Sequence, residues 1–365
     1  TPESLRYFFF WLYQLWDGRN TTEIVKPEDV ALPPYYPDTK TVRADIAQHY
    51  NNRAEMDRQV GEALTALEQD GLLDTTIVIW MTDHGDGLPR AKRELYDSGI
   101  NVPVIVRWPD KFTPPNIKPG SKDNRLISTL DLAPTILRLA SVELPEYLHG
   151  SSFLTSNREY VFASRDRIDY VPDRQRAVRD KRFKYIRSWH PDLVQGHRLA
   201  FRDNINMVRE MRDLFYAGQL SEKQASWFQA VGSERLFNVI TDPHEVENLA
   251  GEVTYSAELA RLRKVLDEKL VELGDSAAST ETDLVRSFNT SGERLVTEVP
   301  SSDISDCLLF LSPTTPGSSL AWRRLKEHWK LYAEPIDICN LGAVEIRAVR
   351  YGWLASEIKR IELDI

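Results

Sequence analysis

Two apolar runs joined by a polar loop constrain what this chain can fold into more than any other feature. Residues 75–81 and residues 102–106 are almost continuously apolar and rich in β-branched side chains. Runs of this length predict strands that are buried on both faces, as in a mainly parallel sheet. A helical spacing of apolar residues precedes the first run, at 41–70, and another follows the second run, at 128–140. We therefore predict an α/β fold whose mainly parallel sheet is flanked by helices.

The end of the first run carries the residues that point to chemistry. Ligands of α/β folds bind at the carboxyl ends of strands, and Asp83 and His84 stand at such an end. Both side chains can ligate a divalent metal, for which a carboxylate favours calcium, with magnesium as the alternative. Arg90 and Lys92 follow in the same loop and could receive an anionic ester beside that metal. Taken alone, the Asp-His-Gly sequence fits a solvated turn with a hydrogen-bonded Asp equally well.

The pattern of the chain changes after residue 155. Short alternating segments followed by a helical pattern predict a small antiparallel α+β subdomain at 156–275. A small, polar linker follows, and residues 283–365 alternate again, which predicts an all-β module. We thus expect three parts, with residues 1–155 forming the α/β part.

Composition and the first residues of the chain bear on its partners, its location and its cysteine chemistry. The net charge is −9, so nucleic acid is a poor partner, and no apolar run approaches the length of a membrane span. The aromatic run at residues 7–13 predicts a buried strand rather than a signal peptide, because it lacks a basic start and a small-residue cleavage site. A chain that opens inside a core strand suggests that something upstream is missing. The two cysteines, Cys307 and Cys339, lack zinc-site spacing, and whether they pair stays open.

Taken in order, these motifs resemble the sulfatase family of the alkaline-phosphatase-like superfamily. The resemblance covers about residues 28–275 and is strongest over 75–109, which contains the sequence Asp-His-Gly-Asp-Gly-Leu-Pro-Arg-Ala-Lys-Arg. It implies a partial alkaline-phosphatase-like sheet, with Asp83 and His84 as two metal ligands. It also implies that Lys92 contacts the substrate sulfate and that Arg90 is a second, less securely matched contact. In the family, the residue at Asp131 is mostly structural.

The sequence of the loop at residues 87–99 is most similar to that of heparan N-sulfatase-like enzymes and bacterial polysaccharide sulfatases. This similarity implies a sulfated carbohydrate substrate, a calcium (or magnesium) ion and a periplasmic or secreted location, and it gives no oligomeric state. Residues 165–167, Arg-Asp-Arg, either line the sugar pocket or form a salt-bridged surface loop. Residues 283–365 resemble a chitobiase-like β-sandwich, which implies an accessory role with glycans. We expect its tryptophans, Trp322, Trp329 and Trp353, in the core rather than exposed for stacking on sugars.

The sequence departs from the family at features that matter for activity, because it lacks both the formylglycine motif and the Asp-Asp pair that the family has after its first strand. Sulfatases of this type use a formylglycine nucleophile made from Cys (or Ser) in a Cys-x-Pro-x-Arg type motif, and neither Cys307 nor Cys339 has that context. We therefore expect an N-terminally truncated sulfatase, inactive alone, whose formylglycine lies upstream in the intact protein. Two alternatives remain: a phosphodiesterase or phosphonate hydrolase of the same superfamily, and a non-catalytic glycan-binding protein on a decayed sulfatase fold. The retained Asp83, His84 and Lys92 argue against a decayed site.

Overall fold

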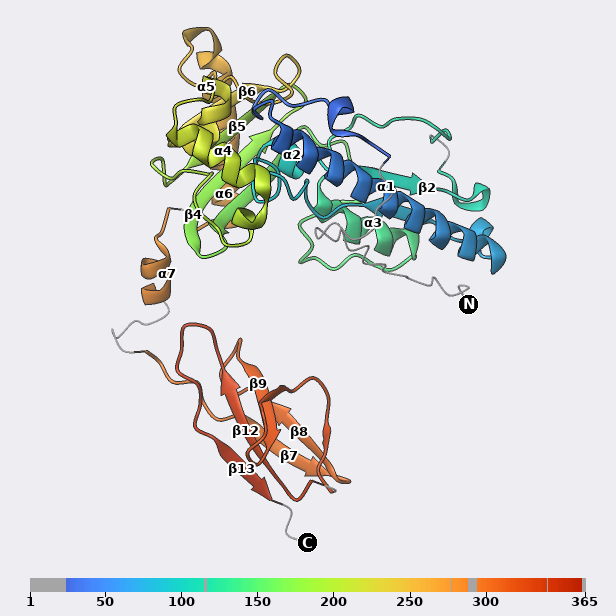
Figure 1. Cartoon of the computed structure of the whole chain (residues 1–365). Coiled ribbons are helices and arrows are strands. Elements are labelled where there is room, and N and C mark those ends of the chain that lie inside the picture. The colour runs from blue at the N-terminus through green and yellow to red at the C-terminus, as the bar shows by residue number, and fades with distance from the viewer. Residues whose placement is uncertain (1–23, 115–116, 277, 288–293, 340, 363–365) are drawn as a thin grey trace. The chain divides into compact units, whose positions relative to one another are not determined.

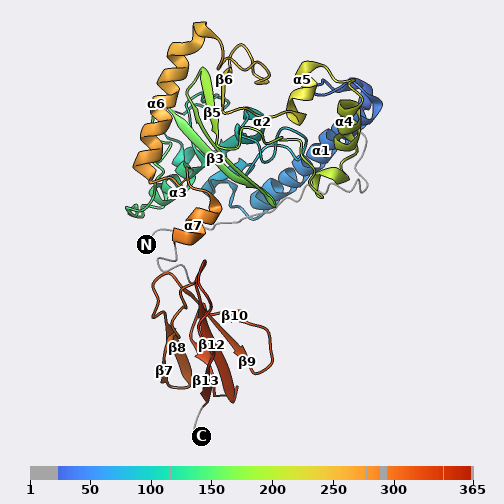
Figure 2. The ribbon, with the colours of Figure 1, turned by 90° about the vertical axis from the view of Figure 1, so that its left-hand side faces the viewer.

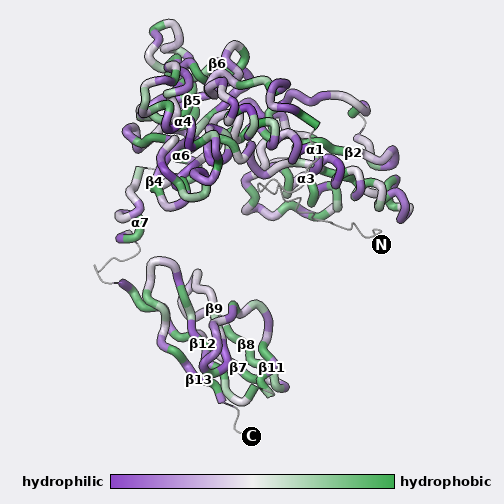
Figure 3. The backbone as a smooth tube through the Cα atoms, in the orientation of Figure 1, coloured by the Kyte–Doolittle hydropathy of each residue, from purple (hydrophilic) through white to green (hydrophobic). Residues whose placement is uncertain are grey.

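The computed structural model describes residues 24–114, 117–276, 278–287, 294–339 and 341–362 (Figure 1). The chain divides into two compact units between Asp275 and Ser276, and each is described by itself. The strand predicted at residues 7–13 lies outside the described residues. Hydrophobic residues are spread in short stretches along the tube of Figure 3, and none of the helices described here is long and apolar enough to cross a membrane.

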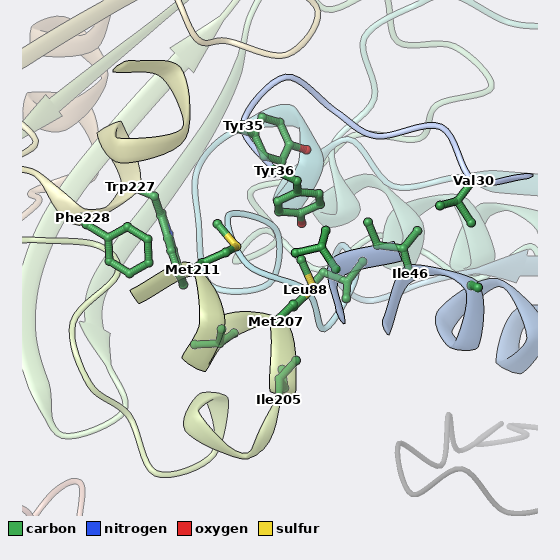
Figure 4. Close-up of a cluster of buried hydrophobic side chains, with 13 residues drawn as sticks. Val30, Tyr35, Tyr36, Ile46, Leu88, Ile205, Met207, Met211, Trp227 and Phe228 are labelled. Atoms are coloured by element: carbon green, nitrogen blue, oxygen red, sulfur yellow. The ribbon is translucent and has the colours of Figure 1, made fainter. Parts of the chain in front are cut away.

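A long helix lies near the start of the described residues of the first unit. Helix α1 spans Lys40–Gln69, close to its predicted bounds. The Thr39 hydroxyl caps it by accepting a hydrogen bond from the Val42 N–H at 3.1 Å, and Gly71 ends it with a left-handed φ of 67°. The first half of α1 packs against α4 (Asn206–Tyr216) around a buried cluster (Figure 4). The cluster consists of Val30, Tyr35, Tyr36, Val42, Ile46, Ala47, Leu88, Ile205, Met207, Val208, Met211, Trp227 and Phe228.

The two apolar runs form strands, but not in the predicted arrangement. Strands β1 (Val78–Met81) and β2 (Val104–Arg107) pair antiparallel, with Trp80 opposite Ile105. The α/β class is confirmed, whereas the parallel pairing expected for these two runs is not found. They are also only partly buried, and Ile105 is 61% exposed. The reason is that, within the described residues, this sheet has two strands and so lacks neighbours that would cover both faces.

The second sheet of this unit is antiparallel, as the alternating pattern predicted. Its strand order is β3 (Val161–Ile168), β4 (Val171–Arg179), β5 (Phe183–Ser188) and β6 (Glu234–Asn238). Helix α6, Ser256–Leu273, lies along one face (Figure 2). Its contacts form the cluster Val178, Phe183, Tyr185, Leu236, Leu262 and Leu266. Another cluster contains Leu95, Tyr96, Ala177, Ile186, Phe237 and Val239, so the loop that follows β1 packs against the same sheet. The short helices α2 (Asp97–Ile100) and α5 (Glu222–Ala225) complete the unit.

Asp131 directly precedes helix α3 (Leu132–Leu139), and its side chain binds three other segments, at Ser128, Ser151 and Arg158. Its buried carboxylate accepts hydrogen bonds from the N–H groups of Ser128 (3.0 Å) and Ser151 (2.9 Å) and from Arg158 Nε (2.7 Å). Burial by itself would raise the pKa of Asp131, but these donors outweigh it and lower that pKa below its usual value. The structural role implied for Asp131 by the resemblance agrees with these contacts.

We expect the substitution Asp131→Asn to lower the free energy of unfolding by about 2 kcal/mol at pH 7, because a neutral amide replaces a charge that accepts several hydrogen bonds. Because the pKa of Asp131 is lower in the folded than in the unfolded state, its charge stabilises the fold fully at pH values above the unfolded-state pKa of about 3.9. This stabilisation is lost as the pH falls through the folded-state pKa. The difference in the free energy of unfolding between the unmodified chain and the Asp131→Asn variant should therefore be smaller at acidic pH. Urea unfolding of both proteins at pH 7 and pH 3 measures this difference. A difference that does not change with pH would contradict the role of the Asp131 charge.

The second unit is a β-sandwich preceded by a short helix. Its sheets have the strand orders β10-β9-β12-β13 and β11-β8-β7. The elements are α7 (Glu281–Ser287), β7 (Ser301–Ser305), β8 (Leu308–Ser312), β9 (Ser319–Arg324), β10 (Lys330–Leu331), β11 (Ile336–Asp337), β12 (Ala343–Val349) and β13 (Lys359–Glu362). Cys307 and Cys339 form a disulfide, which settles the pairing that the sequence left open. Trp322 packs against the core as expected, whereas Trp329 lies against the guanidinium groups of Arg323 and Arg347.

Candidate functional site

Asp83 and His84 follow β1 and lie side by side at its end. The Asp83 side chain is 70% exposed and that of His84 is 39% exposed, with His84 Nε2 3.5 Å from Asp83 Oδ1. His84 Nδ1 lies 2.7 Å from the carbonyl oxygen of Gly85, which can only accept a hydrogen bond. This contact favours the tautomer with the proton on Nδ1 and leaves the lone pair of Nε2 available. Both side chains can therefore reach one ion from solvent.

The glycine after this pair fixes the path of the loop. The N–H of Gly85 donates to the carbonyl of Gly99 at 2.9 Å. A Cβ atom on Gly85 would lie 1.9 Å from the carbonyl oxygen of Ser98, so no larger residue fits without moving the backbone. The close approach ties the end of β1 to the start of β2 through helix α2.

Asp86 holds the middle of the loop against helix α1. Its carboxylate lies 3.1 Å from Nε2 of the buried His49 and is paired with Arg53. Burial alone would raise the pKa of Asp86, but His49 and Arg53 outweigh it and lower that pKa. Its carbonyl accepts a hydrogen bond from the Lys92 N–H at 2.8 Å. Asp86 thus positions the backbone of Lys92 relative to α1.

The two cations of the loop, Arg90 and Lys92, have different surroundings. Arg90 is buried, and its guanidinium donates to the carbonyl of His244 (2.6 Å) and to that of Glu245. It also lies over the rings of Tyr35 and Tyr96. These contacts give Arg90 a packing role and do not favour the substrate contact predicted for it. Lys92 is partly exposed and forms no ion pair within the described ranges of the chain.

Beneath the loop lies a network of buried charges. Arg165 pairs with Glu94 and Asp173, and all three side chains are almost completely buried. Arg165 Nη1 also donates to the carbonyl of Arg93 at 2.7 Å. From the sequence, residues 165–167 are expected either to line the sugar pocket or to form a salt-bridged surface loop. Arg165 forms salt bridges, but they lie in the interior and not on the surface. Burial lowers the pKa of the neighbouring Arg202 to about 10, which still leaves it charged at neutral pH.

A second buried group anchors the end of the loop. Lys184, on β5, lies 2.5 Å from Asp97 and 2.8 Å from Glu245, and Arg179 lies 3.1 Å from Asp97. Burial, the largest influence, raises the pKa of Glu245. Sequence reasoning missed these residues because their partners are far apart in the chain. The closely spaced charges of the segment from Arg93 to Asp97 were the available clue.

The residues at the strand end fit part of a metal site. Asp83 and His84 supply one hard oxygen and one imidazole nitrogen close enough to share an ion. Calcium takes six to eight ligands, and the described residues contain no group of three or more His, Cys, Asp or Glu side chains arranged around one ion. The chemistry of the pair therefore fits two ligands of a divalent metal.

Comparison with known proteins finds sulfatases among the family models, the curated relatives and the solved structures. A family model described as Sulfatase matches residues 25–142, and one described as N-sulphoglucosamine sulphohydrolase, C-terminal, matches residues 90–225. An "Ulvan-active sulfatase" of Formosa agariphila is 39% identical over 344 residues, which cover 90% of this chain and 56% of that protein. The human "N-sulphoglucosamine sulphohydrolase" is 28% identical over 276 residues, 67% of this chain and 51% of that protein.

Among solved structures, one described as a 2-O GAG sulfatase is similar with a TM-score of 0.49 and 26% identity, and the match covers 68% of this chain and 47% of that one. The chain spans about half the length of the curated relatives that it matches.

Proposed function

Residues 25–225 belong to the sulfatase family, and we propose that the intact protein is a sulfuric-ester hydrolase acting on a sulfated carbohydrate. The observation that carries the proposal is the strand-end pair Asp83–His84 followed by Lys92, a cation without an ion pair in the described part of the chain. The name of the 39% identical relative makes ulvan the first substrate to test.

Each residue of the site has a proposed part in binding the ester. Asp83 and His84 would hold a divalent metal, preferably calcium, which would withdraw charge from the bound sulfate. Lys92 Nζ donates to another sulfate oxygen and balances the charge that develops there. Asp86 and Arg90 act as positioning residues, because they fix the loop backbone from α1 and from the segment at His244 and Glu245.

The two cysteines of the chain do not supply the nucleophile. Cys307 and Cys339, the two cysteines of the sequence, are bonded to each other, so neither is available as a precursor of formylglycine. We propose that a formylglycine outside these 365 residues attacks sulfur in the intact protein. The disulfide also supports the periplasmic or secreted location implied by the family, because such bonds persist in oxidising compartments.

The proposal predicts different activities for the chain and for the protein encoded by its full reading frame. The 365-residue chain should release no sulfate from ulvan. The longer protein, co-expressed with a formylglycine-generating enzyme, should release it, and chelation should abolish release until calcium is restored. Ion chromatography of free sulfate measures both, with the Asp83→Asn variant of the longer protein as an inactive control.

Three outcomes would count against the proposal. A longer protein that contains Cys-x-Pro-x-Arg yet releases no sulfate from any sulfated glycan would favour a glycan-binding role. Hydrolysis of phosphonate or phosphate diesters in preference to sulfate esters would favour the phosphohydrolases of the superfamily. Release of sulfate by the 365-residue chain would show that the nucleophile lies within it.

A further inference from the structure

An exposed aromatic ring lies beside the loop that carries Lys92. The Phe201 side chain is 55% exposed and belongs to none of the hydrophobic clusters of the described residues. Lys92 Nζ lies 6.0 Å from the centroid of its ring, and Arg93 Cζ lies 5.3 Å from it. Lys92, Arg93 and Phe201 therefore form one surface, called here the Phe201 platform.

Arg93 is held in place before any ligand binds. Its Nε and Nη2 donate to the two carboxylate oxygens of Asp169 at 3.2 and 3.1 Å. Its carbonyl accepts a hydrogen bond from the buried Arg165, and its φ of 77° is left-handed. Such a conformation persists in a non-glycine residue only where its surroundings impose it, and it is found preferentially at functional sites. A fixed side chain loses little entropy when a ligand binds.

The segment that carries Phe201 contains buried polar atoms without partners. Arg202 Nη2 donates to the carbonyls of Gln195 (2.8 Å) and His197 (2.7 Å). Nevertheless, Gln195 Nε2, His197 Nε2 and Arg202 Nε are buried without a hydrogen-bond partner. Unpartnered buried nitrogens lower stability, and each calls for an explanation such as an ordered water or ion. All three belong to the segment 195–202, which contains Phe201.

We propose that the Phe201 platform binds the sugar ring of the sulfated substrate, next to the sulfate group on Lys92. This inference rests on the function proposed above, because it takes Lys92 as the sulfate contact. The apolar face of the sugar covers Phe201, while Arg93 and Lys92 attract the anionic substituents of the same ring. The platform should therefore bind a sulfated sugar more tightly than a small sulfate ester of equal charge.

Equilibrium binding by the 365-residue chain tests the platform without turnover. Isothermal titration calorimetry would compare a sulfated ulvan tetrasaccharide with inorganic sulfate. The Phe201→Ala variant should bind the tetrasaccharide about tenfold more weakly than the unmodified chain. Its affinity for inorganic sulfate should not change, and Phe201→Trp, which keeps an aromatic face, should restore tetrasaccharide binding. Lys92→Ala should weaken the binding of both ligands.

Phe112 provides a matched control. It is 39% exposed and has Lys111 Nζ 5.4 Å from its ring centroid, but it belongs to the helical turn Asp110–Phe112 and has no contact with Lys92 among those described. Phe112→Ala should leave both affinities unchanged. Equal tetrasaccharide affinities of the Phe201→Ala variant and the unmodified chain would overturn the inference, and so would a chain that binds no tetrasaccharide.

The outcomes separate this inference from the proposed function. If the longer protein releases sulfate while Phe201→Ala binds the tetrasaccharide normally, the hydrolase stands and the platform is wrong. If Phe201→Ala weakens binding while the longer protein releases nothing, the platform stands as a glycan-binding surface and the hydrolase is wrong.

Discussion

Replacing Lys92 by alanine in the intact protein should lower kcat/KM for a sulfated oligosaccharide by about 10²–10³-fold, the usual cost of removing one group that stabilises developing charge. The geometry gives the reason. The Lys92 N–H is anchored to the Asp86 carbonyl at 2.8 Å, while its ammonium group has no carboxylate partner among the described residues. Binding of an anionic ester would therefore not have to break an existing ion pair of Lys92. Initial-rate assays of sulfate release measure the effect.

Two further variants make the test specific. Lys92→Arg keeps the charge but not the compact ammonium group, so it should recover only part of the activity. Lys118→Ala removes an exposed lysine from another loop and should leave kcat/KM unchanged. If Lys92→Ala retained full activity in a folded protein, Lys92 would not be the sulfate contact, and the match of this loop to the family would be misplaced.

The comparison of Arg90 with Lys92 shows where prediction from sequence stops. Both residues are basic and lie two positions apart in one loop, and both are predicted to contact the sulfate, Arg90 less securely. The structure separates them because Arg90 finds carbonyl partners 154 and 155 residues further along the chain. Local patterns do predict the bounds of α1, which depend on the Thr39 cap and on Gly71. They do not predict long-range partners, which depend on how distant segments meet.

The strand pair illustrates the same limit. The apolar run at residues 75–81 correctly predicts strand β1 and the placement of Asp83 at its end. A continuous apolar run indicates that both faces are meant to be covered, but it contains no information on the direction of the neighbouring strand. The antiparallel pairing with β2 and the exposure of Ile105 are consequences of tertiary contacts. The buried charges of Glu94 and Lys184 were missed for a similar reason, because charged residues are normally exposed.

Replacing Arg165 by methionine should lower the free energy of unfolding by about 3–5 kcal/mol, the usual cost of removing one partner from a buried ion pair. Arg165 is 6% exposed and pairs with Glu94 and Asp173, whose side chains are fully buried. Methionine fills much of the space but leaves two carboxylates without their main partner. Arg202 cannot compensate fully, because it lies 3.8 Å from Glu94 and its Nη2 already donates to the carbonyls of Gln195 and His197.

Guanidinium unfolding followed by circular dichroism measures this loss, and the exposed Arg58 supplies the control. Arg58 pairs with Glu55 and Glu62 on the surface of α1, so Arg58→Met should change stability little. The triple variant Arg165→Met, Glu94→Gln, Asp173→Asn should recover part of the stability, because it removes the unpaired charges along with the cation. A loss as small as that of Arg58→Met would mean that water reaches Glu94 and Asp173. In that case, the network beneath the loop would not hold Lys92 and Arg93 rigidly, and the pre-organised platform at Phe201 would lose its physical basis.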